Sequence, residues 1–413
     1  MKICFFTENY YKGGLDTFLI NLFNAWPDSH DKLTLVCNST HSGLETIIEK
    51  TIRPINIKRY SRFFTSKISQ GQSPLKFSQS FPVRAFFVLA YRFLQYPILL
   101  PWYLVNLTFF FWRSDYERLM VVNGGYPASL LGRCAVIAWR LSGKRPLATF
   151  NFHNSASKPL WYFSFPERIL DMAVIWSSKH FVSVSKNCLN TLYSRNAFLG
   201  CTKLSYIYNG IEDPKSSLKD IKVGIDGPSA VGRYCLMLAT YEARKGHAYL
   251  LQAFSIIVNN FSDVRLEIYG YGKPHEKSQV ANEVKRLGLE NKVFLNDFSI
   301  NTTSLIANAS VLVVPSQSFE CFGLTIIEAM ALGTPVVTTD VGGMPEVIGD
   351  SRAGYVCSRE APETFADAIN NILMDPVLAS DMGLHGRQAF EERFMARTMA
   401  YKYKQLIEEV SCR

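Results

Sequence analysis

Two glutamates and a glycine-containing turn near position 320 hold the densest chemistry in this chain of 413 residues. An apolar run, VLVVP, predicts a buried strand, and Gly323 follows it at the start of a predicted helix. The backbone N–H groups of Gly323, Leu324 and Thr325 would point out of the helix N-terminus, a position that favours a phosphate. Glu320 precedes this helix and Glu328 lies inside it, eight residues further on. The two carboxylates can therefore meet different parts of one ligand.

The segment 316–346 (SQSFECFGLTIIEAMALGTPVVTTDVGGMPE) resembles the signature of retaining glycosyltransferases of family 4, which have the GT-B fold. That family carries two glutamates separated by seven residues, and Cys321 stands where it usually has a glycine. The resemblance implies that Glu320 contacts hydroxyls of a donor sugar and that Glu328 binds the ribose of the nucleotide. It also implies that Phe322 and the three residues after it belong to the donor site. The alternative interpretation is a helix N-terminus with incidental carboxylates.

A basic turn made of Arg244, Lys245 and Gly246 follows the first predicted strand of the second half. It resembles the K-G element of the family, whose lysine binds the leaving diphosphate. Cations suit that role because charge on the leaving group grows in the transition state. The family often places an arginine five or six residues before this lysine, but Ala239 and Thr240 stand there, so Arg244 is expected to supply the second charge. A solvated basic turn is the alternative.

Four further residues are candidates for the site. His153, in FNFHN, ends a predicted strand in the first half, where family members have a histidine near the donor sugar and the reacting centre. The resemblance therefore implies a catalytic role, and a structural histidine is the alternative. Gly13 and Gly14 resemble the N-terminal glycine loop of the family, and a glycine pair lets the backbone approach a phosphate or an acceptor closely. Gly270, in YGYGK, follows a strand and is expected to face the nucleotide.

Metal-binding patterns are missing from the sequence. There is no D-x-D pair and no zinc-type spacing of Cys and His, so we expect no metal and no cofactor besides the donor substrate. Lysine, arginine and a helix dipole would then neutralise the diphosphate. The basic residues are spread along the chain and match no nucleic-acid motif, so we expect no nucleic-acid partner.

Predicted strands and helices alternate along both halves, which indicates the α/β class with parallel, doubly wound sheets. Long helical runs are expected at 83–112 and 159–180, and Ser185 is expected to cap a helix. The expected strands are 2–7, 33–37, 118–122, 147–151, 181–184, 234–239, 264–269, 292–295, 310–314 and 335–338.

The domain organisation follows from a change in composition. Residues 211–232 are rich in Gly, Pro, Ser and charge, and predict a linker just after the N-G-I element at 209–211. We expect two Rossmann-like domains of GT-B type facing across a cleft, with the active site in that cleft at the carboxyl ends of the strands. The expected parts are an acceptor-binding domain at 1–210, a nucleotide-sugar-binding domain at 233–385, and a C-terminal helix at 386–413 that returns toward the first domain.

Composition limits the class and the compartment. Apolar residues make up 48% and charged residues 19%, which excludes a disordered chain, a coiled coil and a collagen-like fibre. The chain has nine cysteines but no C-x-x-C pair, and its start lacks the apolar core of a signal peptide. Both features predict the reducing cytoplasm.

Residues 93–112 form an uncharged stretch of twenty residues, about the length of a membrane span. Because Pro97, Pro101 and Asn106 interrupt it, we expect either a helix buried in a domain or one lying at a membrane interface. Trp102 and Trp112, with the adjacent Tyr103, would anchor an interfacial helix. Together with the net charge of +9, this predicts peripheral contact with the anionic inner face of a membrane.

The resemblance implies transfer of a sugar from a nucleotide diphosphate sugar, with UDP preferred over GDP, to a hydroxyl of a glycan or lipid-linked acceptor. It also implies retention of anomeric configuration, and we expect a place in surface polysaccharide biosynthesis. Two alternatives stay open: a nucleotide-sugar epimerase of GT-B fold, and an inactive GT-B binding module.

Overall fold

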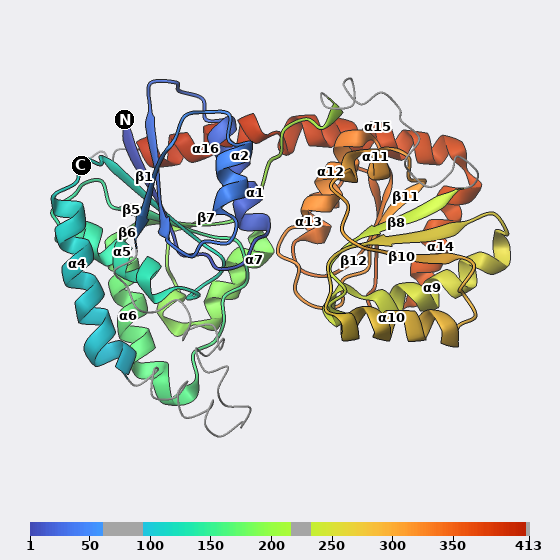
Figure 1. Ribbon diagram of the computed structural model, residues 1–413, viewed down its shortest axis with the longest axis horizontal. Helices are drawn as coiled ribbons and strands as arrows, with labels where there is room; N and C mark the ends of the chain where they lie inside the picture. Colours follow the sequence, from blue (N-terminus) through green and yellow to red (C-terminus); the bar gives the residue numbers. More distant parts are fainter. Residues whose placement is uncertain (61–93, 216–232, 410–413) are drawn as a thin grey trace. The chain divides into compact units, whose positions relative to one another are not determined.

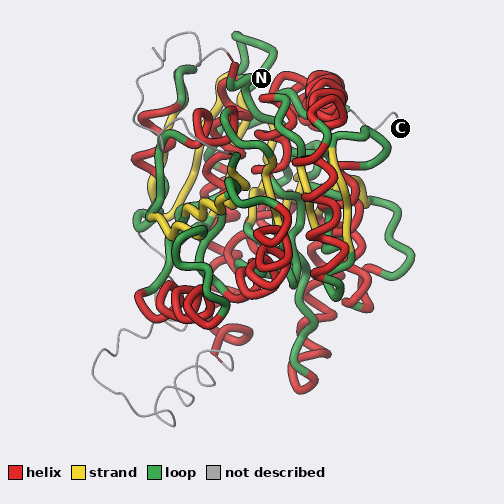
Figure 2. Tube along the Cα trace, turned by 90° about the vertical axis from the view of Figure 1, so that its right-hand side faces the viewer, coloured by secondary structure: helices red, strands yellow, loops and turns green. Residues whose placement is uncertain are grey.

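The chain folds into two units, seen in a computed structural model that describes residues 1–60, 94–215 and 233–409. The N-terminal unit comprises Met1–Ile207 and Met399–Arg413, and the C-terminal unit comprises Tyr208–Thr398. Each unit has a parallel sheet with helices on both sides of its strands (Figures 1 and 2). The α/β class with two parallel-sheet domains is therefore confirmed.

The described part of the N-terminal unit has a seven-stranded sheet with the order β3-β2-β1-β4-β5-β6-β7. The outward steps from β1 to β3 and from β4 to β7 make it doubly wound. Its strands are β1 Lys2–Thr7, β2 Lys32–Asn38, β3 Asn56–Tyr60, β4 Arg118–Asn123, β5 Ala148–Phe152, β6 Ser178–Ser183 and β7 Leu204–Tyr206. Its helices are α1 Gly14–Asn24, α2 Leu44–Lys50, α4 Leu100–Trp112, α5 Leu130–Leu141, α6 Ser164–Ser177 and α7 Lys186–Asn190.

Strand β1 shows why helices cover both faces of this sheet. Its residues are almost all buried, and neighbouring side chains point to opposite faces. The Phe5 ring packs on Phe23 of α1, with 5.0 Å between ring centroids, whereas Phe6 packs on Phe111 of α4 at 6.4 Å. A strand that is apolar on both faces needs a helical layer on each side.

The described part of the C-terminal unit has a six-stranded parallel sheet with the order β10-β9-β8-β11-β12-β13. Its strands are β8 Tyr234–Leu238, β9 Arg265–Tyr269, β10 Val293–Asn296, β11 Val311–Val314, β12 Val336–Thr339 and β13 Gly354–Cys357. Its helices are α9 His247–Asn260, α10 Pro274–Arg286, α11 Thr302–Ala307, α12 Leu324–Leu332, α13 Met344–Ile348, α14 Pro362–Met374 and α15 Pro376–Arg393.

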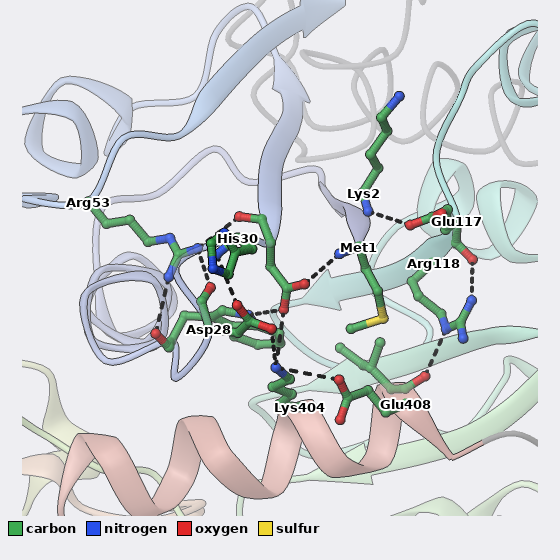
Figure 3. A network of polar contacts seen from close by, with 12 residues as sticks. Met1, Lys2, Asp28, His30, Arg53, Glu117, Arg118, Lys404 and Glu408 are labelled. Atoms are coloured by element: carbon green, nitrogen blue, oxygen red, sulfur yellow. Dashed lines mark hydrogen bonds and ion pairs between the residues drawn. The ribbon is translucent and has the colours of Figure 1, made fainter.

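The last helix, α16 (Ala396–Glu408), packs on the N-terminal unit from Met399 onward. Its buried residues Met399, Tyr403 and Ile407 join the apolar core beneath α1. Lys404 adds an electrostatic contact: its Nζ lies 2.8 Å from a carboxylate oxygen of Asp28 and 3.4 Å from Glu408 (Figure 3). Burial and charge together therefore hold this helix on the unit that contains the chain's first residues.

Two expectations about the elements are corrected by the structure. The returning segment begins at Met399 and not at residue 386, because α15 packs on α12 of the C-terminal unit. A Cβ on Gly383 would lie only 2.2 Å from the carbonyl oxygen of Gly333, so the two segments touch through their backbones. The helix expected at 159–180 is shorter, since Trp161–Phe163 is a 3-10 turn and β6 starts at Ser178.

The other expectations about the elements differ in outcome. Ser185 caps α7 by accepting a hydrogen bond from the backbone N–H of Cys188. The sequence did not predict β3, at one edge of the seven-stranded sheet, or β13, at one edge of the six-stranded sheet. Of the expected 83–112 helix, residues 94–112 are described, and the other residues lie outside the described part, as does 216–232 of the expected linker. Among the described residues, no helix is long and apolar enough to cross a membrane.

Candidate active site

The Lys245–Gly246 turn lies at the carboxyl end of β8, beside the end of its neighbour β11. Gly246 has φ +82°, and a Cβ there would lie 1.8 Å from the carbonyl oxygen of Pro315. Only glycine permits both this backbone conformation and this close approach. The turn is therefore held against the loop that follows β11 and carries Glu320.

Charged side chains of these two loops meet. The Nζ of Lys245 forms an ion pair and a hydrogen bond with the Glu320 carboxylate. Arg244 lies close by: its Nη1 is 4.0 Å from Glu320, and its Nε donates a 2.6 Å hydrogen bond to Glu242. Arg244 also lies over the ring of Phe319, 5.3 Å from the centroid. The structure thus brings together two cations and the first signature glutamate.

Glu320 is positioned through its backbone by Gly342 and Gly343, the glycine pair near the end of the signature segment. The backbone N–H of Gly343 donates a 2.8 Å hydrogen bond to the carbonyl oxygen of Glu320. Gly342 has φ +63°, and a Cβ on it would lie 2.0 Å from that same oxygen. The glycine pair therefore supports the loop that carries Glu320.

Helix α12 begins directly after this loop. Gly323 is its N-cap with φ +93°, and Leu324 and Thr325 form its first turn. The first N–H groups of a helix lack partners inside the helix, so the turn can receive an anion. The ring of Phe322, which precedes Gly323, is 3% exposed and packs on Tyr208. Its side chain supports the start of α12 and does not present an open face.

Glu328 lies one turn further along α12. Burial raises the pKa of its carboxyl to about 7. Among the residues that the structure describes, none forms a hydrogen bond or an ion pair with this carboxyl. The side chain is half-buried. Partial loss of water around an acid that has no protein partner costs free energy in the ionised form, and hydrogen bonds from two hydroxyl groups would relieve that cost.

Gly270 has a packing role that the sequence did not indicate. A Cβ on it would lie 1.7 Å from the carbonyl oxygen of Ala239, so the ends of β8 and β9 touch here. The next residue, Tyr271, is 66% exposed and stacks on Phe298 with 4.6 Å between ring centroids. This exposed ring pair follows β9 and β10 and was missed by the sequence analysis. Two aromatics directly after neighbouring predicted strands were the available signal.

The glycine loop of the N-terminal unit is held by Asp16. Its carboxylate accepts hydrogen bonds from the Gly13 backbone N–H at 2.9 Å and from the Asn9 side chain at 3.1 Å. It also pairs with the buried His41, 2.8 Å away. A Cβ on Gly13 would meet nothing within 4 Å, so the loop leaves open space at this point. The sequence analysis missed Asp16 and His41; an acid in the first turn of α1 was the available signal.

His153 lies next to this loop, at the end of β5. Its ring centroid is 4.2 Å from that of Phe18 on α1. Burial lowers the pKa of His153 to about 3, so the imidazole is neutral near pH 7. Within the described residues, its buried Nε2 has no hydrogen-bond partner. The neutral ring can therefore exchange a hydrogen bond with a ligand but carries no charge.

The predicted site residues thus form two groups. One, in the C-terminal unit, combines Lys245, Arg244 and Glu320 with the start of α12 and Glu328. The other, in the N-terminal unit, places His153 beside α1 and its glycine loop.

Comparison with known proteins agrees with this geometry. Residues 229–389 match the family described as glycosyl transferases group 1. An alpha-1,3/1,6-mannosyltransferase of Dictyostelium discoideum is 29% identical over 43% of this chain and 46% of its own length. An N-acetyl-alpha-D-glucosaminyl L-malate synthase of Bacillus anthracis is 32% identical over 45% of this chain and 47% of its own length. A phosphatidyl-myo-inositol mannosyltransferase of Mycobacterium tuberculosis is 32% identical over 38% and 41%. These matches span less than half the length of each relative.

Solved structures match over nearly the whole chain. A glycosyltransferase of Rickettsia africae has a TM-score of 0.73 at 17% identity, covering 98% of this chain and 97% of its own. An Anabaena protein in complex with UDP has a TM-score of 0.70 at 16% identity, covering 99% and 100%. The fold is that of GT-B glycosyltransferases. The segment that matches the glycosyl transferases group 1 family, residues 229–389, contains the signature at 316–346. The resemblance found in the signature is thereby confirmed.

Proposed function

We propose that this protein transfers a sugar from a UDP-sugar to a hydroxyl of a glycan or lipid-linked acceptor, with retention of configuration and without a metal ion. The observation that carries the proposal is the meeting of Lys245, Arg244 and Glu320 where two parallel strands end beside the start of α12. Ligands of such sheets bind at these carboxyl ends. UDP is preferred because a structure with this fold is bound to UDP.

Lys245 changes partner in the proposed mechanism. Without donor it pairs with Glu320, and with donor it would turn to the diphosphate, whose negative charge grows as the bond to the sugar breaks. Arg244 and the first N–H groups of α12 would add to this stabilisation. Glu320, released from Lys245, could then accept hydrogen bonds from hydroxyls of the sugar.

Glu328 and His153 take the remaining roles. The unpartnered carboxyl of Glu328 is matched chemically to the two hydroxyls of a ribose. His153 would hydrogen-bond the transferred sugar or the acceptor as a neutral imidazole, because its pKa is about 3. Gly13 and Gly14 would let the substrate approach the backbone at the start of α1.

The proposed setting is the inner face of a membrane, in the synthesis of surface polysaccharide. One relative is named for a phosphatidyl-myo-inositol acceptor, which supports a lipid-linked substrate here. The basic net charge of +9 supports peripheral contact with anionic lipid.

A panel of UDP- and GDP-sugars tests the reaction. Purified protein should release UDP slowly from one UDP-sugar and faster when an acceptor is added, and NMR of the product should show the anomeric configuration of the donor. A new UDP-sugar isomer without net transfer would identify an epimerase. Donor binding without turnover of any panel member would identify an inactive module, and an inverted product would overturn retention.

A further inference from the structure

The tryptophans of this chain are divided sharply between core and surface. Trp26 and Trp139, two of the six, are buried, at 4% and 0% exposure. The other four lie on or next to α4 and α6 of the N-terminal unit, and each is more than half exposed: Trp102 56%, Trp112 64%, Trp161 86% and Trp176 52%. Large exposed aromatics gathered on two helices mark an interaction surface.

Helix α4 packs one side on the protein and leaves an apolar side outside. Tyr103, Leu107 and Phe111 follow each other at four-residue spacing and are at most 2% exposed. The opposite side carries Val105, 69% exposed, and Phe109, 49% exposed, between the two tryptophans. No charged residue occurs from position 94 to 112. A helix whose outward face contacts only water normally carries polar and charged residues there, so this apolar face suggests contact with another apolar surface.

Helix α6 reverses the usual amphipathic pattern. Its acids point inward, where Glu167 and Asp171 pair with the buried guanidinium groups of Arg133 and Arg195. Its outward side is largely apolar, with Arg168 as its exposed charge. The exposed apolar residues of this segment are Leu160, Trp161, Tyr162, Phe165, Ile169, Met172 and Trp176.

The two outward faces belong to one layer of the unit. Both helices pack on α5, and Figure 1 shows all three on one side of the sheet. The Tyr96 hydroxyl, just before α4, donates a 2.6 Å hydrogen bond to Glu167 of α6, and the Tyr96 ring lies 5.7 Å from that of Phe163. At the other end of α6, Arg140 of α5 lies over the Trp176 ring, 3.3 Å from its centroid. We call the exposed faces of α4 and α6, together with the exposed residues 160–162 just before α6, the tryptophan surface.

Three exposed basic residues border the tryptophan surface. Arg113 follows α4, Lys158 precedes α6 and Arg168 lies on α6, and all three are exposed. The nearest exposed acid after α4, Asp115, forms an ion pair with Lys2 at 2.5 Å. Exposed tryptophans with arginine and lysine beside them are the composition of a surface that inserts at the level of anionic lipid headgroups.

We propose that the tryptophan surface docks this protein on an anionic lipid bilayer, with α4 and α6 lying in the interface together. This builds on the membrane contact within the proposed function and adds α6, for which the sequence gave no expectation of membrane contact. Docking by two adjacent helices fixes the orientation of the N-terminal unit on the membrane, which one helix alone would leave free to roll. The lipid surface thereby becomes the partner that presents a lipid-linked acceptor.

Intrinsic fluorescence tests the proposal directly, because the four exposed tryptophans report binding over a constant signal from the two buried ones. Vesicles of equimolar phosphatidylcholine and phosphatidylglycerol should shift the emission to shorter wavelength. Brominated lipid in the same vesicles should quench it. Vesicles of phosphatidylcholine alone should bind at least about tenfold more weakly, since about 1 kcal/mol per basic residue near an anionic surface is lost. No shift with either vesicle would overturn the proposal.

Variants assign the contact to its helices. The double variant Trp161→Ser/Phe165→Ser, at the turn before α6 and on its first residues, is called the α6 variant. It and Trp102→Ser/Val105→Ser on α4 should each weaken vesicle binding by about tenfold or more in co-sedimentation. Ile52→Ser is the matched control, because Ile52 is an apolar residue that is 90% exposed in the same unit. It follows α2, which Figure 1 shows on the other side of the sheet, so its loss should not change vesicle binding. If the α6 variant binds like the wild type, the role of α6 is overturned.

Two further measurements test whether the tryptophan surface binds a second copy of the chain and whether the docking inference is independent of catalysis. A second copy of the chain on this surface would appear as a dimer in analytical ultracentrifugation that the α6 variant dissociates while vesicle binding stays unchanged, and this would overturn lipid docking. UDP release from a soluble donor, measured on the α6 variant, should equal that of the wild type, because none of its changed residues lies in the candidate active site. Vesicle binding by a protein without transfer activity would leave the docking inference intact and reject the proposed function alone.

Discussion

Single side chains of the C-terminal unit differ in what their surroundings do to charge. Lys245 and Glu320 neutralise each other in a partly exposed ion pair, whereas the half-buried Glu328 has no partner among the described residues and its pKa rises to about 7. The first pair is ready to be opened by a diphosphate. The Glu328 carboxyl would be stabilised in its ionised form by hydrogen bonds from hydroxyl groups. The two glutamates of the signature should therefore respond differently to substitution and to pH.

Lys245→Ala should lower kcat by roughly 10²–10³-fold, because its contribution grows with leaving-group charge. Glu328→Ala should mainly raise the donor KM, since the ribose is unchanged during the reaction. Glu320→Ala should change both constants and alter the choice among UDP-sugars most. Steady-state kinetics of the three variants checks this, with the exposed Lys285→Ala as control. A Glu328→Ala enzyme with unchanged donor KM but no turnover would place Glu328 at the reacting centre.

Glu328 also predicts a pH dependence. Its pKa in the folded, donor-free protein is about 7, so the carboxyl is protonated below that pH and must lose the proton to accept from a ribose. Donor KM should therefore rise as pH falls below about 7, and Glu328→Gln should abolish this rise. Because the folded pKa lies above the ordinary value, native stability falls as pH rises through the window up to about 7. Glu328→Gln should accordingly raise Tm more at pH 8 than at pH 5, which calorimetry can measure.

At the scale of elements, glycines decide how closely loops approach. Gly342 and Gly13 both belong to glycine pairs, but their surroundings are opposite. A Cβ on Gly342 would lie 2.0 Å from the Glu320 carbonyl oxygen, whereas a Cβ on Gly13 would meet nothing within 4 Å. The first glycine shapes the site loop and the second leaves space.

Gly342→Ala should destabilise the protein by about 1–3 kcal/mol and raise the donor KM, because φ is +63° and the Glu320 loop must shift. Gly13→Ala should leave thermal stability unchanged. Urea unfolding of both variants distinguishes them. Equal losses of stability would show that the Gly342 contact does not shape the loop. A higher KM for Gly13→Ala at unchanged stability would support substrate contact at the glycine loop.

Helix α16 depends on Lys404 for its contact with Asp28, which lowers the pKa of that carboxyl. Lys404→Met keeps the apolar stem but removes the charge, so hydrogen exchange of α16 amides should become faster. Since the Asp28 pKa is lowered, this contribution is present at neutral pH and is lost as pH falls through that pKa. Lys402→Met, an exposed lysine on the same helix, is the control and should leave exchange unchanged. Equal protection in both variants would mean that the buried Tyr403 and Ile407 hold the helix alone.

At the scale of the whole molecule, the chain passes between its units twice, at residues 207–208 and 398–399. The N-terminal unit is thus completed by the last segment of the chain. The two passes are joined within the C-terminal unit, where the backbone N–H of Ile211 donates to Phe394 and that of Ala396 donates to Ile211. The two connections therefore run as a pair and not as independent linkers.

Activity of the full chain should persist in EDTA. In the proposed mechanism, Lys245, Arg244 and the start of α12 would supply the positive charge that a divalent ion supplies in metal-dependent transferases. The described residues also contain no cluster of three or more His, Cys, Asp or Glu side chains placed to hold a metal. UDP release with and without EDTA is the measurement. Loss of most activity, restored by Mg²⁺ or Mn²⁺, would contradict the proposed mechanism.

The sequence by itself determined the α/β class, the central strands of both sheets and the loop that carries Glu320. Buried strands read as continuous apolar runs, and the signature residues lie close together along the chain, so local patterns were sufficient. The edge strand β10 was predicted, but β3 and β13 were not, because β3 (NIKRY) is largely polar and β13 (GYVC) starts with a glycine and is buried only at its last residue. The extent of the 159–180 helix and the start of the returning segment were wrong, because strand pairing and backbone contact override local helical pattern.

Only the tertiary structure decided which residues meet and which face water. Lys245 and Glu320 are 75 positions apart, and their ion pair exists because β8 and β11 are neighbours in the sheet. The pKa values of Glu328 and His153 depend on burial by segments distant in the chain. The outward direction of the α6 aromatics follows from the inward pairing of its acids with Arg133 and Arg195. A sequence lists these residues, but burial and charge pairing are properties of the packed chain.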